Sequence, residues 1–190
     1  MASIRTASHL PALRVPHARE QAGGDLEQTA QELIGLALVA KQLHWTVVGP
    51  LFRPLHQQFD ELSRSWHELA DVVAERAATL GHMPNGQATA VAGVAGDPVE
   101  VIPIEGAAAV WEITRRLSQV SERTRERMDR LGELDLASQD TLTGVVRALE
   151  QHQWMLRVQL GESVADVYER GRRIGSRVLL HNVPLDSEAS

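Results

Sequence analysis

The chain has 190 residues, a formal net charge of −6, eight histidines and no cysteine. This length suits one domain with terminal extensions, and the lack of cysteine excludes disulfides, thiolate metal sites and cysteine nucleophiles. The negative net charge argues against a protein whose whole surface binds nucleic acid, although a basic tail could still bind it. No apolar run reaches the roughly 20 residues of a membrane span, and the N-terminus lacks the apolar segment of a signal peptide, so we expect a cytoplasmic protein.

The first expected helix follows an N-terminal arm. Residues 1–24 contain two prolines and a Gly-Gly pair and predict a flexible arm. From Asp25, residues of one helix face recur at steps of three or four, namely Leu26, Ala30, Leu33, Ala37, Ala40 and His44. Gly49 and Pro50 end this segment.

The second expected helix, from about 54 to 80, has the clearest apolar stripe. Its members are Leu55, Phe59, Leu62, Trp66, Leu69, Val73, Ala77 and Leu80. Gly81 followed by Pro84 predicts its end. Residues 82–106 are rich in Gly, Pro and Ala and predict a long connection with room for one short helix.

Two further helices complete the pattern. The third spans roughly 107–132, with a buried face opposite a dense run of charge and with Gly132 as its end. Ser138 is the expected N-cap of the fourth, which runs to Gly161. The sequence thus predicts an all-α four-helix bundle over 25–161, with a long crossover between helices two and three and a C-terminal extension over 162–190.

A second stripe runs beside the apolar face of the second helix. His56, Asp60, His67, Asp71 and Glu75 lie within an arc of about 100° and contain only groups that can donate a lone pair to a cation. His44 continues the buried face of the first helix and is expected to point toward a neighbouring helix. A lone inward histidine usually satisfies a core hydrogen bond, but carboxylates and a second histidine nearby favour metal ligation.

The spacing of these residues predicts a site that two subunits share. His56 and Asp60 are one helical turn apart, as are Asp71 and Glu75, but the pairs are 15 residues apart, or about 22 Å along a helix. Two copies crossing antiparallel would bring the first pair of one chain to the second pair of the other. We therefore expect two identical sites in a two-fold dimer, and a monomeric protein would contradict this.

The donor set indicates the class of metal. Two imidazoles and three carboxylates without thiolate suit iron or manganese and tolerate zinc. Five ligands exceed a closed tetrahedral zinc site, and bridging carboxylates favour two metal ions held close together. A structural zinc site remains the alternative.

The stretch from Lys41 to Gly81 resembles the core signature of the Dps family, the ferritin-like mini-ferritins of starved bacteria. The matching elements are His44–Trp45, Gly49, Phe52, Leu55–His56, Asp60, Asp71, Ala74–Glu75–Arg76 and Leu80–Gly81. The resemblance implies a hollow shell of twelve subunits with di-iron centres between subunits. It assigns His44, His56 and Asp60 to one subunit and Asp71 and Glu75 to its mate, with Glu75 as the bridging ligand.

The resemblance also implies the reaction. The family oxidises Fe(II), preferably with hydrogen peroxide, stores Fe(III) mineral in the cavity and so protects DNA. Trp45 resembles the tryptophan near the iron centre, with packing at a subunit interface as an equal alternative. Asp135 and Asp140 match acidic positions at the iron-uptake pores, although a first-turn aspartate also suits a helix dipole.

Two other histidines are weaker candidates. His67 is not required by the family signature, and we interpret it as a partner for a neighbouring side chain rather than as a supplementary ligand. His152 lies on the apolar face of the fourth helix and is interpreted as a hydrogen-bonded core residue.

Alternative functions remain open at this stage. An intra-subunit ferritin centre is weak, because the sequence has no Glu three residues before a His. A nucleoid-binding structural protein with weak ferroxidase activity would use Arg-containing arms and have weak, salt-sensitive affinity for DNA. The N-terminal arm contains Arg5, Arg14 and Arg19, and a denser cluster near the C-terminus contains Arg170, Arg172, Arg173 and Arg177. A third option is a shell that binds iron or zinc without efficient oxidation.

Overall fold

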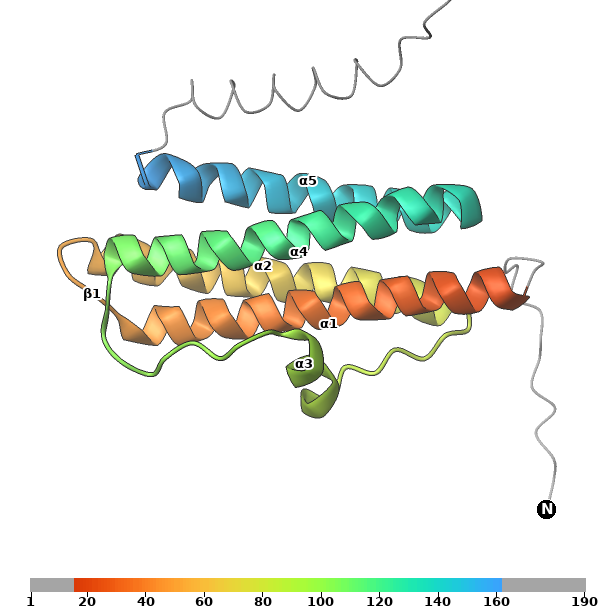
Figure 1. The fold of residues 1–190 in the computed structure, drawn as a ribbon, viewed down its shortest axis with the longest axis horizontal. Coiled ribbons are helices and arrows are strands. Elements are labelled where there is room, and N and C mark those ends of the chain that lie inside the picture. The colour runs from red at the N-terminus through yellow and green to blue at the C-terminus, as the bar shows by residue number, and fades with distance from the viewer. Residues whose placement is uncertain (1–15, 162–190) are drawn as a thin grey trace, which may run out of the picture.

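A computed structural model describes residues 16–161, which form five helices and two very short strands (Figure 1). Four helices are long: α1 (Pro16–Thr46), α2 (Phe52–Thr79), α4 (Gly106–Leu134) and α5 (Leu136–Gln159). The connection between α2 and α4 contains α3 (Ala88–Val94), and the strands are β1 (Val47–Val48) and β2 (Ile104–Glu105). None of the helices in this part of the chain is long and apolar enough to cross a membrane.

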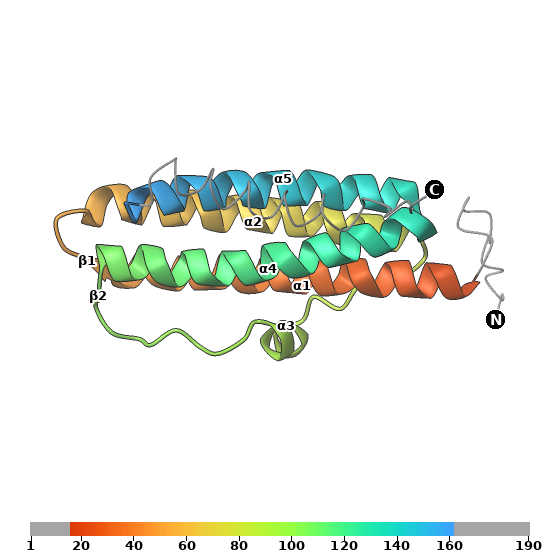
Figure 2. The same ribbon diagram turned by 45° about the horizontal axis from the view of Figure 1, so that its top comes forward.

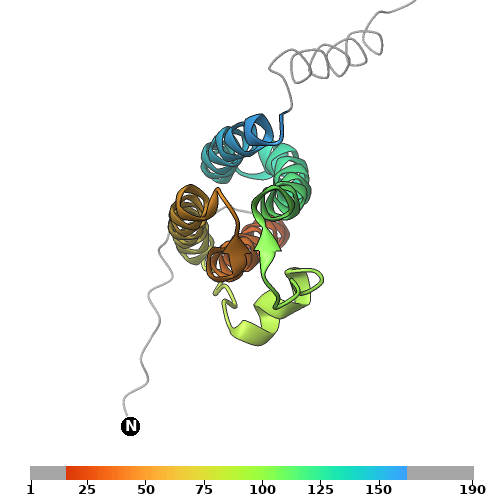
Figure 3. The ribbon, with the colours of Figure 1, turned by 90° about the vertical axis from the view of Figure 1, so that its left-hand side faces the viewer.

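The long helices form a four-helix bundle, which confirms the predicted fold class. Helix α1 packs mainly on α2 and α4 mainly on α5, and the end-on view shows the four axes at the corners of a square (Figure 3). The interior contains the apolar stripes read from the sequence, with Leu33, Phe59, Trp66, Leu117 and Leu149 fully buried. Burial of these stripes supplies the main stabilisation of the bundle.

The crossover runs along the outside of the bundle. It passes beside α1, where α3 packs, and so links the two ends of the molecule (Figure 2). At its end β2 pairs with β1 in parallel, Val47 opposite Ile104 and Val48 opposite Glu105. The sequence predicted the short helix, but two-residue strands carry no periodic signal.

Helix α1 begins at Pro16, nine residues before the expected start, so residues 16–24 are helical and the prediction of an arm over this segment is wrong. The Gly-Gly pair does not break the helix. The absence of a side chain at Gly23 instead allows the His82 side chain to lie close to α1. A Cβ on Gly23 would lie 2.5 Å from the His82 side chain. The added turns also bury Ala22 in the core.

The junction of α4 and α5 also differs from the prediction. Helix α4 continues through Gly132 to Leu134, and a Cβ at Gly132 would lie 2.5 Å from Gln139. Asp135 rather than Ser138 stands at the N-cap of α5, with extended backbone, and the Ser138 hydroxyl donates to its carboxylate at 2.5 Å. A glycine that allows close packing and a glycine that ends a helix look the same in sequence.

The charged run of α4 is only partly solvated. Arg127 is buried and donates to Glu32 of α1 at 2.7 and 3.1 Å, while Arg123 donates to the same carboxylate at 2.6 Å. Arg116 is buried as well and donates to Glu112 on its own helix. Buried charges need such partners, because desolvation of an unpaired ion is costly.

The predicted arms lie largely outside the described residues. Arg5 and Arg14 precede Pro16, and the cluster of Arg170, Arg172, Arg173 and Arg177 follows Gly161. Their interpretation as DNA contacts therefore stays a prediction.

Candidate metal centre

Two histidines from neighbouring helices meet where α1 ends and α2 begins. The rings of His44 and His56 stack with centroids 3.6 Å apart and an interplanar angle of 19°. Both residues are half-buried, and the Phe52 ring lies 5.1 Å from that of His56. The expectation that His44 faces a neighbouring helix is confirmed.

The backbone fixes the protonation pattern of this pair. His44 Nδ1 lies 2.6 Å from the His56 carbonyl oxygen, and His56 Nδ1 lies 2.7 Å from the His44 carbonyl oxygen. A carbonyl only accepts, so each Nδ1 carries the proton and donates it. In the neutral ring each Nε2 therefore keeps a lone pair, as in histidines that bind metals through Nε2 and are oriented through Nδ1.

Asp60 lies one turn after His56 and has both carboxylate oxygens in ion pairs. Lys41 of α1 pairs with Oδ1, and Arg64 donates to Oδ2 at 3.0 Å. The hydrogen bond from Lys41 is the main reason why the pKa of Asp60 is lowered, so Asp60 is a carboxylate at neutral pH.

Asp71 and Glu75 lie farther along α2 and are exposed to solvent. They are separated from the histidine end by the 15-residue spacing, about 22 Å on a continuous helix. Within the described residues of one chain, no three His, Asp or Glu side chains come together in a way that could hold a metal ion. The assignment of five ligands from two subunits stays a prediction.

Large apolar side chains stand exposed around the two ends. Trp45 next to His44 is 66% exposed, Leu51 and Phe52 at the start of α2 are exposed, and Val72 is exposed next to Asp71. Exposed apolar clusters of this kind mark contact surfaces. Both interpretations of Trp45, near the metal or at an interface, are compatible with this position.

The weaker candidates are placed as follows. His67 is exposed, and its Nδ1 donates to the Ser63 carbonyl of its own helix at 2.9 Å rather than to a side chain. Asp135 is held by Arg76 at 2.6 Å, and Asp140 is exposed one turn later on α5. Their proposed roles at an iron-uptake pore remain predictions.

His152 is half-buried at the edge of the core and is hydrogen-bonded, as its position on the apolar stripe predicted. The indole Nε1 of Trp66 donates to His152 Nδ1 at 3.1 Å, and the rings meet edge to face. Burial lowers the pKa of His152, so the ring is neutral and accepts this hydrogen bond.

Sequence reasoning missed Lys41 as a partner of the site. It is the single lysine of the chain and lies three residues before His44, hence on the same helix face. That spacing was the available signal, but a pairing with Asp60 depends on how α1 and α2 are aligned.

Comparison with known proteins gives concordant results. The ferritin-like domain profile matches residues 25–163. The chain is 35% identical over 143 residues to the fine tangled pili major subunit of Haemophilus ducreyi, covering 71% of this chain and 72% of the relative. It is 30% identical over 165 residues to the DNA protection during starvation protein of Mycolicibacterium smegmatis, covering 83% and 89%.

The fold is similar to that of solved structures. The tetragonal form of Mycobacterium smegmatis Dps superposes with a TM-score of 0.76 at 32% identity, over 87% of this chain and 97% of that one.

Proposed function

The chain belongs to the Dps family of ferritin-like proteins, and from this premise we propose that it is an iron-binding, DNA-protecting protein that oxidises Fe(II) at centres shared between two subunits. Each centre would use His44, His56 and Asp60 of one subunit together with Asp71 and Glu75 of its mate. Twelve subunits would enclose a cavity in which the Fe(III) product is stored as mineral.

The observation that carries this proposal is the reciprocal arrangement of His44 and His56. Each ring is oriented by the backbone carbonyl of the other residue through Nδ1. This leaves both Nε2 lone pairs directed away from the backbone without a protein partner in the described chain. A core histidine that served only packing would have no need of such pre-orientation, whereas a ligand gains affinity from it.

The exposure of the acidic end supports sharing between subunits. Asp71 and Glu75 face solvent in the single chain, and apolar side chains flank both ends of α2. A second copy crossing antiparallel would cover these apolar groups and bring two carboxylates to the histidine pair. Carboxylates so buried would be balanced by the iron.

Lys41 supplies the positive charge at Asp60 when iron is not bound. Its ammonium occupies one carboxylate oxygen, and Arg64 occupies the other. We propose that Fe(II) competes with Lys41 for Asp60, because a divalent cation interacts more strongly with a carboxylate than a monovalent one. The lysine would then move toward solvent, to which it is already partly exposed.

The chemistry needs an oxidant that accepts two electrons. Two Fe(II) ions each lose one electron, the O–O bond of hydrogen peroxide breaks, and with two protons two water molecules form. Dioxygen is the alternative oxidant. Removal of both Fe(II) and peroxide limits hydroxyl-radical formation, which accounts for DNA protection without direct DNA binding.

The proposal is tested by loading the assembled protein with Fe(II) without oxygen and then adding hydrogen peroxide. We expect rapid oxidation, followed by a particle that retains many iron atoms per shell. Asp71→Ala should abolish the rapid phase, while Asp129→Ala, an exposed position on α4, should leave it unchanged. The proposal would be refuted if the wild-type protein oxidised Fe(II) no faster than buffer without protein, or if the iron stayed outside the particle.

Direct DNA binding through the Arg-containing arms is a separate proposal. Its affinity should be low and salt-sensitive, because each chain offers few phosphate contacts and avidity must come from many copies. An unchanged electrophoretic mobility of DNA at low salt and about pH 6, where histidines gain charge, would contradict it.

A further inference from the structure

A ladder of ion pairs joins α1 to α4, and its rungs repeat every seven residues. Arg130 donates to Asp25 at 2.7 Å, and Arg123 donates to Glu32 at 2.6 Å. The helices are antiparallel, so each step of seven forward on α1 matches a step of seven backward on α4. The repeat of seven corresponds to two turns, which keeps successive rungs on the same face.

The third rung lacks its acid. One more step of seven places Val39 on α1 opposite Arg116 on α4. The Arg116 side chain is only 9% exposed, and its Nε donates a hydrogen bond to Glu112 one turn earlier on the same helix. In the described part of the chain, no carboxylate of α1 reaches the outer edge of this guanidinium.

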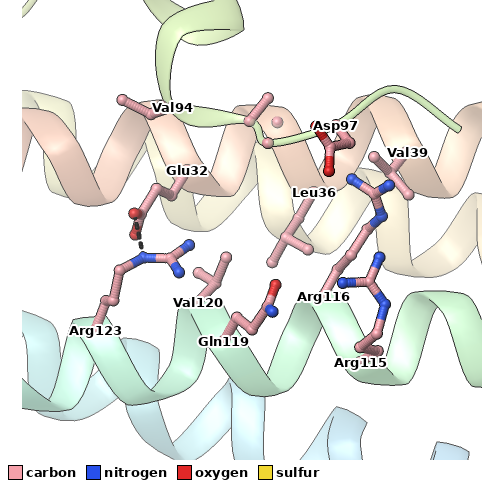
Figure 4. Close-up of a pocket in the computed structure, with 13 residues that line it drawn as sticks. Glu32, Leu36, Val39, Val94, Asp97, Arg115, Arg116, Gln119, Val120 and Arg123 are labelled. Atoms are coloured by element: carbon pink, nitrogen blue, oxygen red, sulfur yellow. Dashed lines mark hydrogen bonds and ion pairs between the residues drawn. The ribbon is translucent and has the colours of Figure 1, made fainter.

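A cavity occupies the position of the missing acid. It measures about 380 Å³ and lies between α1, α4 and the crossover after α3. Figure 4 shows Arg115 and Arg116 side by side at one end, with Val39 beside them, Arg123 held by Glu32 at the other end, and Leu36 between the two ends. The wall thus combines guanidinium groups with aliphatic side chains, as small-molecule sites commonly do.

Arg115, Arg116 and Arg123 line this cavity together with the carboxylates of Glu32 and Asp97. Glu112, which lies outside the lining, pairs with Arg115 and Arg116, and Glu32 is shared by Arg123 and Arg127. Asp97 comes from the segment after α3, and its carboxylate points toward the Arg116 end of the cavity (Figure 4), although it forms no ion pair with an arginine among the described residues. A carboxylate delivered beside Arg116 would complete the ladder.

We propose that this cavity binds a small aliphatic monocarboxylate. Its carboxylate group would lie against Arg116, at the step of the seven-residue repeat where α1 has Val39 instead of an acidic residue. The carboxylate accepts from the outer edge of Arg116, where a planar guanidinium fits two oxygens, and Arg115 adds attraction. The aliphatic part contacts Leu36, Val39 and Val120. The site lies on the crossover side of α1 and shares no residue with the proposed iron centre.

The probe that matches this chemistry is isovalerate, a branched aliphatic monocarboxylate. We expect saturation transfer from the assembled full-length protein to its methyl groups in NMR, with saturable binding at millimolar concentration. 3-Methylbutanol, which has the same branched chain without the charge, should give no saturable signal. Stronger binding of inorganic phosphate than of isovalerate would overturn the assignment to carboxylates.

Two variants locate the binding. Arg116→Gln should weaken isovalerate binding by about tenfold or more, because a charge-assisted hydrogen bond is lost. Arg147→Gln, the same change at an exposed position of α5, should not change the affinity. Equal affinity in both variants would refute the proposal whatever the iron oxidation assay gives, so its failure is distinguishable from that of the proposed function.

A third variant supplies the missing rung from the chain itself. Val39→Glu should place a carboxylate against Arg116 and abolish isovalerate binding while the particle stays assembled. If Val39→Glu assembles and still binds isovalerate, the ligand does not sit at the third rung and the proposal is wrong. If Val39→Glu does not assemble, the comparison of Arg116→Gln with Arg147→Gln decides alone.

Discussion

Sharing of the proposed iron centre between subunits can be tested by mixing two variants that are each expected to be inactive. His56→Ala removes one ligand from the histidine end of α2, and Asp71→Ala removes one from the acidic end about 22 Å away. In a mixed dimer, one centre contains both defects and the other contains neither. The intact centre uses His56 of the Asp71→Ala chain and Asp71 of the His56→Ala chain.

The expected recovery follows from counting sites. Random pairing makes half of the dimers mixed, and one centre of each mixed dimer is intact, so about one quarter of the wild-type centres should return. The assay is the rate of Fe(II) oxidation by hydrogen peroxide in co-expressed particles, compared with particles of each variant alone. Both single-variant particles should oxidise iron at the background rate.

The control pairs two variants from the same end of α2. His56→Ala mixed with Asp60→Ala leaves each centre of a mixed dimer with one defect, so no activity should return. Recovery in the first mixture and none in the second supports the shared centre. No recovery in either mixture, with particles that assemble normally, would refute sharing.

Three further predictions concern the bundle. Glu32→Gln should lower the free energy of unfolding by about 3 kcal/mol, measured by urea denaturation, because it leaves the Arg127 charge without its partner at a site where the side chains are 5% and 7% exposed. Burial lowers the pKa of His152, so the unfolded chain binds a proton more readily, and stability should decrease as the pH falls below about 6.5; His152→Gln should flatten this slope in thermal melts. Gly23→Ala should destabilise the protein by about 1–2 kcal/mol in the same denaturation assay, because its Cβ would overlap the His82 side chain.

The Glu32 and Gly23 predictions each have a matched control. Glu61→Gln removes a charge from an exposed position of α2 and should change stability by less than about 0.5 kcal/mol. Gly24→Ala adds a Cβ with no atom within 4 Å and should stabilise α1 by about 0.5–1 kcal/mol. If Gly23→Ala stabilises as Gly24→Ala does, the close approach of His82 does not explain the glycine. A pH slope that His152→Gln leaves unchanged would assign the titration to another group.

Much of the fold could be predicted from local pattern. Apolar residues at steps of three and four specify a helix and the face that it buries, and this property belongs to the chain itself. The bundle, the crossover and the burial of Trp66 and His152 were therefore accessible from the sequence. So was the separation of His56 from Asp71, because the rise of a helix is constant.

The features that only the tertiary structure decided are contacts between helices, and these depend on how the helices are aligned with one another. Gly23 and Gly132 look like helix ends in the sequence, but contacts with His82 and Gln139 explain them. The stacking of His44 on His56, the pairing of Lys41 with Asp60 and the ladder from Asp25 to Arg116 all depend on the register of one helix against another. Periodicity determines which face of a helix is buried, whereas the axial position of that helix is determined by packing of side chains distant in the sequence, and the candidate site lies where those contacts meet.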